Sequence, residues 1–471
     1  TILIKNQSLA LAVICTSVRG HRPRLYFATA SSGENTMPFR SALHSTICHN
    51  TNEFQESNAP AGMKSVRPIA AALAIGLIVA SCAPDEPALP ELSFEEALQE
   101  KLIMAQPGDV IEIPAGVHEM TRSLSLNAPG VTIRGLGMDV SILSFKNQAQ
   151  GAEGLLVNAN DFVLENLALE DTVGDALKIN QSENVVIRNV RTEWTGGPLT
   201  TNGAYGIYPV QSKNILIDGA VAIGASDAGI YVGQSSQIIV RNSRAEYNVA
   251  GIEIENSTFA DVYDNVATNN TGGILVFDLP NLPVQGGRNT RVFNNEIVSN
   301  NVDNFAPEGN IVGTVPAGTG MMVLANDNIE IFGNRFADNQ TTNVMVVSYL
   351  INGLPIDDPN YDPFPEAIYI HSNSFEGGGE NPDSEPLIAL QTATGQPIPD
   401  VVWGGAIMPD ANGEPSKTFA EILCLGEGGM SFVNLDAMNG FAAPSFDPAP
   451  HLCEQPRLRK IVLPGDAGSA E

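Results

Sequence analysis

The chain has 471 residues and carries 53 Asp and Glu against 24 Lys and Arg, a formal net charge of −29. So acidic a surface repels nucleic acids and anionic lipids, which excludes the usual ways of binding either. Hydrophobic residues make up 43% of the chain and charged residues only 16%, with 44 glycines. This composition favours a globular protein with many tight turns and little exposed helix. The acidity is also what keeps an exported protein soluble, so it does not by itself indicate a partner.

The first predicted element is a targeting segment. Residues 63–81 begin with Met-Lys-Ser-Val-Arg-Pro, continue with an apolar run over 69–79 and end in Ala-Ser before Cys82. A basic start, a short apolar run and small residues before a cleavage point predict a signal peptide. Residues 79–82, Val-Ala-Ser-Cys, resemble a bacterial lipobox. The resemblance implies that Cys82 is acylated and becomes the mature N-terminus; an ordinary signal peptide followed by an unrelated Cys is the alternative.

This interpretation divides the N-terminal part of the chain. We predict that residues 1–62 are a spurious extension translated from upstream of the true start, and that residues 82–93 are a linker. The lipobox implies an exported protein anchored to the periplasmic face of the outer membrane or to the cell surface, with the lipid as its membrane contact. Two cysteines remain in the mature chain, Cys424 and Cys453, and an oxidising compartment permits a disulfide between them.

A repeat of about two dozen residues organises the next segment, 94–395. It begins with a short amphipathic helix predicted over residues 94–106, followed by Pro-Gly-Asp-Val-Ile-Glu-Ile-Pro-Ala-Gly at 107–116 and Val-Thr-Ile-Arg-Gly at 131–135. This order resembles the N-terminal cap and first coils of pectin-lyase-like β-helices. The resemblance implies an all-β fold: a single-stranded right-handed parallel β-helix with a helical N-terminal cap. We expect residues 396–471 to form an irregular C-terminal cap and tail.

Two columns of residues recur with the repeat. Asn and Gly share the first, and both tolerate left-handed backbone, so we predict a tight turn there in every coil. The residues of this column are Gly135, Asn166, Asn189, Gly219, Asn242, Asn265, Asn295, Asn334 and Asn373. Aliphatic residues stand three positions earlier and are predicted to point into the core. They are Val163, Val186, Leu216, Ile239, Val262, Val292 and Ile331.

Strands of the pattern Gly-Ile-x-Val form a further set, at 229–232, 251–254 and 273–276. Alternation places their two apolar residues inside and the middle residue outside. The outward residues then line up on successive coils as Lys178, Tyr208, Tyr231, Glu253, Leu275, Met322 and Met345, with Glu255 in the flanking row. Insertions at 195–202, 278–287, 303–318 and 352–365 fall beside these strands. Insertions on one face usually build the binding side of a solenoid, although simple surface loops remain the alternative.

Residues 204–210, Ala-Tyr-Gly-Ile-Tyr-Pro-Val, resemble the active-site strand of mannuronan C5-epimerases. That family has Tyr-Gly-Phe-Asp-Pro-His there and a Lys one coil earlier, so Tyr205, Gly206, Pro209 and Lys178 match. Tyr208 stands at the position of the family's catalytic Asp, and Val210 at the position of its His. The resemblance makes Lys178, Tyr205 and Tyr208 candidate catalytic residues. It leaves Tyr231, Glu253 and Glu255 as candidate substrate-binding residues further along the same face.

Two functions follow from this face, and a solvated surface without a ligand is the third interpretation. The favoured one is a cell-envelope lipoprotein that binds polysaccharide or a partner protein without an intact epimerase centre. The alternative is a uronan-active polysaccharide lyase or C5-epimerase. The layout also resembles a family of exported parallel β-helix repeat lipoproteins, and this resemblance implies no known reaction. No zinc motif or EF-hand spacing predicts a metal site, and Ca²⁺ held by acidic turns is the one cofactor considered.

Overall fold

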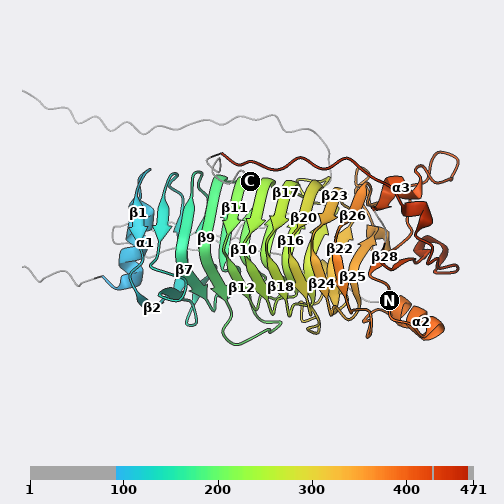
Figure 1. Cartoon of the computed structure of the whole chain (residues 1–471). Helices are drawn as coiled ribbons and strands as arrows, with labels where there is room; N and C mark the ends of the chain where they lie inside the picture. Colours follow the sequence, from blue (N-terminus) through green and yellow to red (C-terminus); the bar gives the residue numbers. More distant parts are fainter. Residues whose placement is uncertain (1–91, 427–428, 465–471) are drawn as a thin grey trace, which may run out of the picture. The chain divides into compact units, whose positions relative to one another are not determined.

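Short parallel strands stacked along one axis form the body of the molecule (Figure 1). The structure is a computed structural model that describes residues 92–426 and 429–464, all within the unit Asp85–Glu471. The predicted extension 1–62, the signal peptide 63–81 and the lipidation site Cys82 lie outside the described residues. Each coil contributes one strand to each of three rows, and every strand of a row pairs in parallel with the strand of the next coil.

The first row begins with β1 and ends with β29. Its strands are β1 (Val110–Glu112), β4 (Thr132–Arg134), β7 (Val163–Glu170), β9 (Glu183–Glu193), β11 (Lys213–Asp218), β14 (Ser236–Arg241), β17 (Thr258–Tyr263), β20 (Arg288–Phe293), β23 (Asp327–Phe332), β26 (Ile368–His371) and β29 (Leu423–Leu425). The second row shares the long strands β7 and β9, so the two rows count as one 19-stranded sheet. It adds β2 (Gly116–Glu119), β5 (Ser141–Ser144), β12 (Val221–Ile223), β15 (Arg244–Glu246), β18 (Val266–Thr268), β21 (Glu296–Val298), β24 (Arg335–Ala337) and β27 (Ser374–Glu376).

The third row is a separate 11-stranded sheet, and it carries the predicted functional face. Its strands are β3 (Arg122–Leu126), β6 (Gln150–Val157), β8 (Leu177–Asn180), β10 (Tyr205–Val210), β13 (Ala228–Gly233), β16 (Ala250–Glu255), β19 (Gly272–Phe277), β22 (Thr319–Leu324), β25 (Thr342–Val347), β28 (Val401–Trp403) and β30 (Phe432–Asn434). Inward side chains of all three rows form one apolar core that runs the length of the coils.

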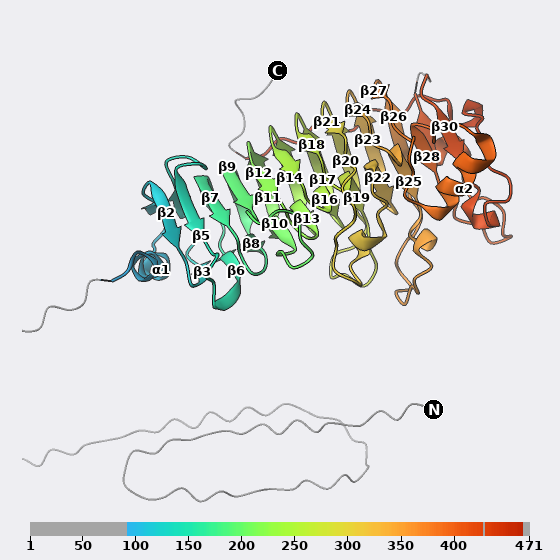
Figure 2. The same cartoon turned by 90° about the horizontal axis from the view of Figure 1, so that it is seen from below.

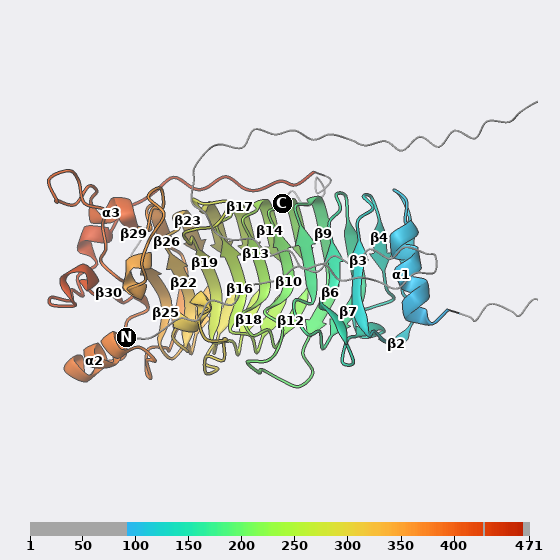
Figure 3. The same cartoon turned by 180° about the vertical axis from the view of Figure 1, so that it is seen from behind.

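Helices lie at the ends of the coil stack (Figure 3). α1 (Phe94–Met104) closes the N-terminal end and places Leu98 and Leu102 in the core, as the predicted cap helix should. Glu95 joins this helix to β3, because its carboxylate accepts hydrogen bonds from the backbone N–H groups of Thr121 and Arg122. The remaining helices are α2 (Glu385–Thr394), α3 (Phe419–Ile422), and the 3₁₀ turns η1 (Ile311–Thr314), η2 (Tyr349–Asn352), η3 (Ala437–Asn439) and η4 (Ala449–His451).

The predicted Asn and Gly column divides into two neighbouring columns. The left-handed turn, where every residue has positive φ, contains Asn166, Asn189, Gly219, Asn242, Asp264, Asn294, Gly333 and Ser372. Arg241 pairs with Tyr263, so this coil is one residue shorter than the coil before it, in which Asp218 pairs with Arg241. Asn265 therefore stands one position beyond the turn, and the predicted column is wrong from this residue onward. Gly135, at the start of the column, also lacks the predicted left-handed backbone.

Asn265, Asn295, Asn334 and Asn373 instead form a buried ladder beside the turn. The side-chain amide of Asn295 donates to the Val262 carbonyl and to Asn334 Oδ1, each at 2.9 Å. Its own Oδ1 accepts from the backbone and side-chain N–H groups of Asn265, each at 3.0 Å. These bonds satisfy backbone groups that a corner between strands leaves without a sheet partner. Asn248, Asn270, Asn300 and Asn339 form a second ladder of the same kind.

Because of the same one-residue difference, the column that was predicted to point inward contains both inward and outward residues. Val262, Val292 and Ile331 do lie in the core. Leu216 pairs with Val186 on one side and with Ile239 on the other, and all three face outward. Leu216 and Ile239 are nevertheless buried, because Ile461 and Leu463 of the C-terminal tail pack on them.

The C-terminal region is more regular than predicted. Val344 pairs with Val401 and Val401 with Phe432, so the sheets continue past residue 395, where the β-helix was predicted to end. The prediction failed because long insertions separate these last strands from their partners and hide the period. The rest of the tail does run irregularly, back across the first row (Figure 1).

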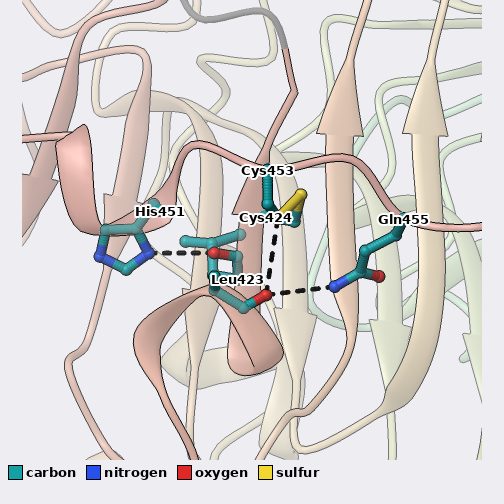
Figure 4. The surroundings of a disulfide bond; sticks show 6 residues. Leu423, Cys424, His451, Cys453 and Gln455 are labelled. Atoms are coloured by element: carbon teal, nitrogen blue, oxygen red, sulfur yellow. Dashed lines mark hydrogen bonds between the residues drawn. A yellow bond between two sulfur atoms is a disulfide. The ribbon is translucent and has the colours of Figure 1, made fainter.

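A disulfide links Cys424 on β29 to Cys453, where this returning tail begins (Figure 4). Hydrogen bonds secure the same point, from Gln455 to the Ala420 carbonyl and between His451 Nδ1 and the Leu423 carbonyl. The tail is therefore fixed at its start by a covalent bond. Its other end is fixed by apolar packing of Ile461 and Leu463.

We expect Asn295→Ala to lower the free energy of unfolding by about 2–4 kcal/mol, because it leaves buried amide and carbonyl groups of two coils without partners. Urea unfolding followed by circular dichroism measures this change. Asn360→Ala is the matched control, since Asn360 is exposed in a loop. Equal unfolding midpoints for the two variants would show that the ladder does not stabilise the coils.

Candidate functional site

The predicted outward row is present on the 11-stranded sheet. Tyr208 on β10 pairs with Lys178 on β8, and on the other side β13 pairs in the register that sets Tyr231 beside Tyr208. Glu253 follows on β16, paired with Tyr231. Leu275, Met322 and Met345 continue the row. The structure therefore brings together the residues that the repeat pattern placed on one face, at the strand spacing of about 4.8 Å.

The first part of this row is open to solvent and combines a cation with aromatic rings. The Lys178 ammonium lies 4.9 Å from the centre of the Tyr208 ring, and the side chain is 25% exposed. The Tyr205 ring lies 4.5 Å from the Tyr208 ring and 4.5 Å from the Tyr231 ring. Tyr205 and Tyr208 are half-buried, so each presents part of its ring at the surface.

Carboxylates surround the one cation of this patch. Lys178 Nζ lies 3.2 Å from Asp175 Oδ2 and 4.0 Å from Glu153 Oε1. Burial raises the pKa of Asp175, against the lowering effect of Lys178. Burial also raises the pKa of Tyr208 to about 12, and nearby carboxylates add to this rise. Tyr208 therefore stays protonated at neutral pH, where it can donate a proton or a hydrogen bond but is a poor base.

Gly206 is the part of the epimerase-like motif whose role is steric. A Cβ there would lie 2.5 Å from the Gly229 carbonyl oxygen and 2.5 Å from Thr192 Oγ1. Glycine is therefore required at this position of β10. The motif positions that hold Asp and His in the epimerases hold Tyr208 and Val210 here, and Val210 is buried.

The second part of the row is covered, so Tyr231, Glu253 and Glu255 do not lie open to solvent as the alternation predicted, while their role as substrate contacts stays a prediction. Their exposed fractions are 3%, 0% and 6%. Two of the insertions that were predicted to line this face, 303–318 and 352–365, pack against it instead. Val315 of the insertion 303–318 packs above Gly272 on β19, and Tyr361 of the next insertion donates a hydrogen bond to the Asp278 carbonyl.

The repeat pattern did not place Asp227 in this row, and the sequence offered it only as one of the acidic turn residues that could hold Ca²⁺. Asp227 directly precedes β13, is 5% exposed, and accepts a 3.0 Å hydrogen bond from Asn310 of the insertion 303–318. Burial and then the charge of Glu255 raise the pKa of Asp227 to about 7. Its place at the start of a Gly-Ile-x-Val strand is the one sequence signal that it lies near the row.

Three carboxyl groups, Asp227, Glu253 and Glu255, thus lie buried together. Burial raises the pKa of Glu255 to about 7, against a 2.6 Å hydrogen bond from the Tyr231 hydroxyl that lowers it. Burial and the charges of Glu255 and Asp227 raise the pKa of Glu253 well above its usual range. Both carboxyl oxygens of Glu253 lack a hydrogen-bond partner. Buried carboxyls without a partner favour the neutral, protonated form.

Exposed amide rows flank the open part of the face. Asn158 donates to Asn127 Oδ1 and Asn180 donates to Asn158 Oδ1, each at 3.2 Å. One residue beyond Asn180, Gln181 donates to Gln211 at 3.0 Å, and Gln211 donates to Gln234 at 3.3 Å. Each amide keeps donor and acceptor capacity toward solvent.

In the part of the chain that the structure describes, no group of three or more His, Cys, Asp or Glu side chains is placed to hold a metal ion. No helix within the same residues is long and apolar enough to cross a membrane.

Comparison with known proteins agrees with this architecture. The model of the family described as "Right handed beta helix region" matches residues 130–286. The chain is a right-handed parallel β-helix. The predicted fold class is therefore confirmed. No curated protein sequence matches the chain.

Several solved structures are similar to this β-helix at low sequence identity. The A-module of a mannuronan C-5 epimerase from Azotobacter vinelandii is 16% identical over 66% of this chain and 85% of that one, with a TM-score of 0.42. An alginate lyase from Paenibacillus is 15% identical over 62% of this chain and 97% of that one, with a TM-score of 0.39. A family 28 exopolygalacturonase from Yersinia enterocolitica is 12% identical over 62% of this chain and 65% of that one, with a TM-score of 0.40.

Proposed function

We propose that the protein is an exported, lipid-anchored β-helix that binds polysaccharide along the open part of its 11-stranded sheet, from β3 to β10. The observation that carries this proposal is the patch where Tyr205, Tyr208 and Lys178 meet at the surface. A tyrosine ring offers a flat apolar surface and a hydroxyl group, which suits stacking on a sugar ring. The row continues on the earlier strands with Leu156 on β6 and Ser125 on β3, so an extended polymer can follow one line beyond this patch.

The exposed amide rows support the same ligand class. Asn158, Asn180 and Gln211 each combine a donor and an acceptor. Sugar hydroxyls also combine both, so they pair with amides without the need for a net charge. A protein partner with an apolar contact surface would gain less from this polar face.

Charge favours a neutral polysaccharide over a uronate polymer. The one cation of the patch, Lys178, already faces Asp175 and Glu153. A uronate carboxylate would have to displace one of these groups or lie beside both. The strongly negative net charge of the chain adds to the repulsion.

We expect Tyr208→Ala to weaken binding to a neutral polysaccharide by about tenfold, because it removes the central stacking ring, a change of ~1.4 kcal/mol. Affinity electrophoresis in gels that contain a neutral glucan, a galactomannan or alginate measures the retardation. Tyr247→Asn is the matched control, since Tyr247 is exposed outside the 11-stranded sheet and its left-handed backbone suits Asn. Retardation by alginate alone, or equal binding by both variants, would contradict the proposal.

The competing candidate is a uronan lyase or C5-epimerase, favoured by the Lys178 and Tyr208 pair on neighbouring strands. Such chemistry removes the proton on the carbon next to the uronate carboxyl group, which needs a base. Tyr208, with a pKa of about 12, is not ionised at pH 7.

We therefore expect no unsaturated product from alginate, polymannuronate or polygalacturonate at pH 7. Ultraviolet absorbance of the unsaturated sugar measures lyase activity, and proton NMR of the polymer measures epimerisation. Turnover that Lys178→Ala or Tyr208→Phe abolishes would establish the enzyme and reject the binding protein.

The lipid anchor has its own test, independent of the sugar. In a Gram-negative host, we expect the chain to fractionate with membranes and Cys82→Ala to leave the membrane fraction, because the variant lacks the acylated side chain. Ala88→Ser in the predicted linker is the matched control and should fractionate like the unmodified chain. A soluble unmodified chain, or a membrane-bound Cys82→Ala variant, would reject lipid attachment at Cys82.

A further inference from the structure

The insertion 303–318 connects β21 to β22 and projects from the coils beside β16 and β19 (Figure 2). Its side chains Val312 and Val315 are almost fully buried against the outer face of the sheet. Asn310 reaches the furthest, to Asp227 at the start of β13. The insertion therefore covers the row where Tyr231 and Glu253 stand.

This insertion has the structure of a unit that can move as one piece. The side-chain amide of Asn304 donates to the carbonyls of Val312 and Val315, each at 2.9 Å, so the loop holds its own shape. Backbone bonds attach its two ends to the coils, from Val302 to Asn270 and from Gly318 to Asn300. A compact loop whose ends lie close together and whose own side chains pack it is an Ω-loop, and such loops are frequently functional.

The surface beneath the loop is unusual because its acidic groups have no basic partner. Among the described residues, no Lys or Arg forms an ion pair with Asp227, Glu253 or Glu255. Neither oxygen of Glu253 has a hydrogen-bond partner. An ionised carboxylate in this position would keep none of the solvation that water gives it, so closure requires neutral carboxyl groups.

Other titratable groups near the cluster do not neutralise it. On the sheet they are Asp175 just before β8, Lys178 on β8, Tyr205 and Tyr208 on β10, and Tyr231 on β13. Asp278 follows β19 and has Arg288, Tyr361 and Asp362 as neighbours. The loop itself carries Asp303 and Glu308. Lys178 already faces Asp175 and Glu153. Arg288 acts on Asp278, whose charge opposes ionisation of Glu255.

We propose that the insertion 303–318 is a lid that closes only while Asp227, Glu253 and Glu255 are uncharged, and that it covers an acid-lined continuation of the polysaccharide-binding row. When the three groups ionise, mutual repulsion and hydration favour the open state. Tyr231, Glu253 and Glu255 then extend the open row by further coils. The ligand part of this inference rests on the proposed function; the lid itself does not. Ionised carboxylates accept hydrogen bonds from sugar hydroxyls and repel uronates, so the opened row also suits a neutral glycan.

The direction of the pH dependence follows from the carboxyl groups. Their pKa values are raised while the lid is closed, with about 7 for Asp227 and Glu255 against 3.8 and 4.5 as ordinary values. The closed lid is most stable at a pH below the ordinary pKa values, where the carboxyl groups are neutral in both the open and the closed state. Closure weakens as pH rises from about 4 to about 7, because the open state releases its protons first. The lid is therefore closed in acid and opens toward neutral and alkaline pH.

Hydrogen exchange of the full chain, followed by mass spectrometry, tests the lid directly. We expect the protection factors of amides in 303–318, corrected for intrinsic exchange, to fall at least about tenfold between pH 5 and pH 8. The double variant Glu253→Gln with Glu255→Gln should show a smaller fall in protection than the unmodified chain, because only Asp227 of the three groups can still ionise. Asp227→Asn, which retains an acceptor for Asn310, is a second variant should the double variant fold poorly.

Glu308→Gln is the matched control, since Glu308 is an exposed carboxyl on the lid, and it should follow the unmodified chain. Protection that does not change with pH in the unmodified chain would overturn the proposal. An equal fall with pH in the double variant and in Asp227→Asn would also overturn it. Polysaccharide binding is measured separately at pH 5, where the lid is closed and only the strands from β3 to β10 are available to the ligand. Its absence would reject the proposed function while the lid result stands.

Discussion

In-register stacking of parallel coils is the constraint on which the rest of the structure depends. Each strand takes its backbone hydrogen bonds from the coils above and below it, so a side chain points inward or outward according to its partners in those coils. Buried Asn ladders carry the same register through the corners, where strands end. The shorter coil between Arg241 and Tyr263 shows how strict this is, because its missing residue moves Asn265 from the turn into the ladder.

The sequence predicts the fold well because the repeat is local and its residue types have one structural meaning each. Aliphatic residues at alternate positions define the third row, and its outward members align as predicted from Lys178 to Met345. Asn was ambiguous because it suits both a left-handed turn and a buried ladder. Leu216 and Ile239 resemble core residues although they face outward, because Ile461 and Leu463, which cover them, are distant in sequence.

The sequence predicts which residues of the candidate site share a row, but not which of them are covered. Register placed Lys178, Tyr208, Tyr231 and Glu253 in one row, but register does not say what covers a row. That depends on how the insertion 303–318 folds, and its irregular sequence has no period to read. Asp227 could not be assigned to the row because it precedes its strand, and its contact with Asn310 of the returning loop is visible only in the structure.

The two parts of the row show how one surface supports different chemistry through burial alone. Carboxyl groups occur in both parts, yet Asp175 has Lys178 beside it and partial hydration, while Glu253 has neither. A buried group without a partner is stable only when neutral, so the covered part depends on protons in a way that the open part does not. Carboxyl groups without partners under the loop lower the stability of the closed form. Positions that break a packing rule in this way are often functional. That physical reason, more than the identity of any single residue, connects the acid cluster to the loop above it.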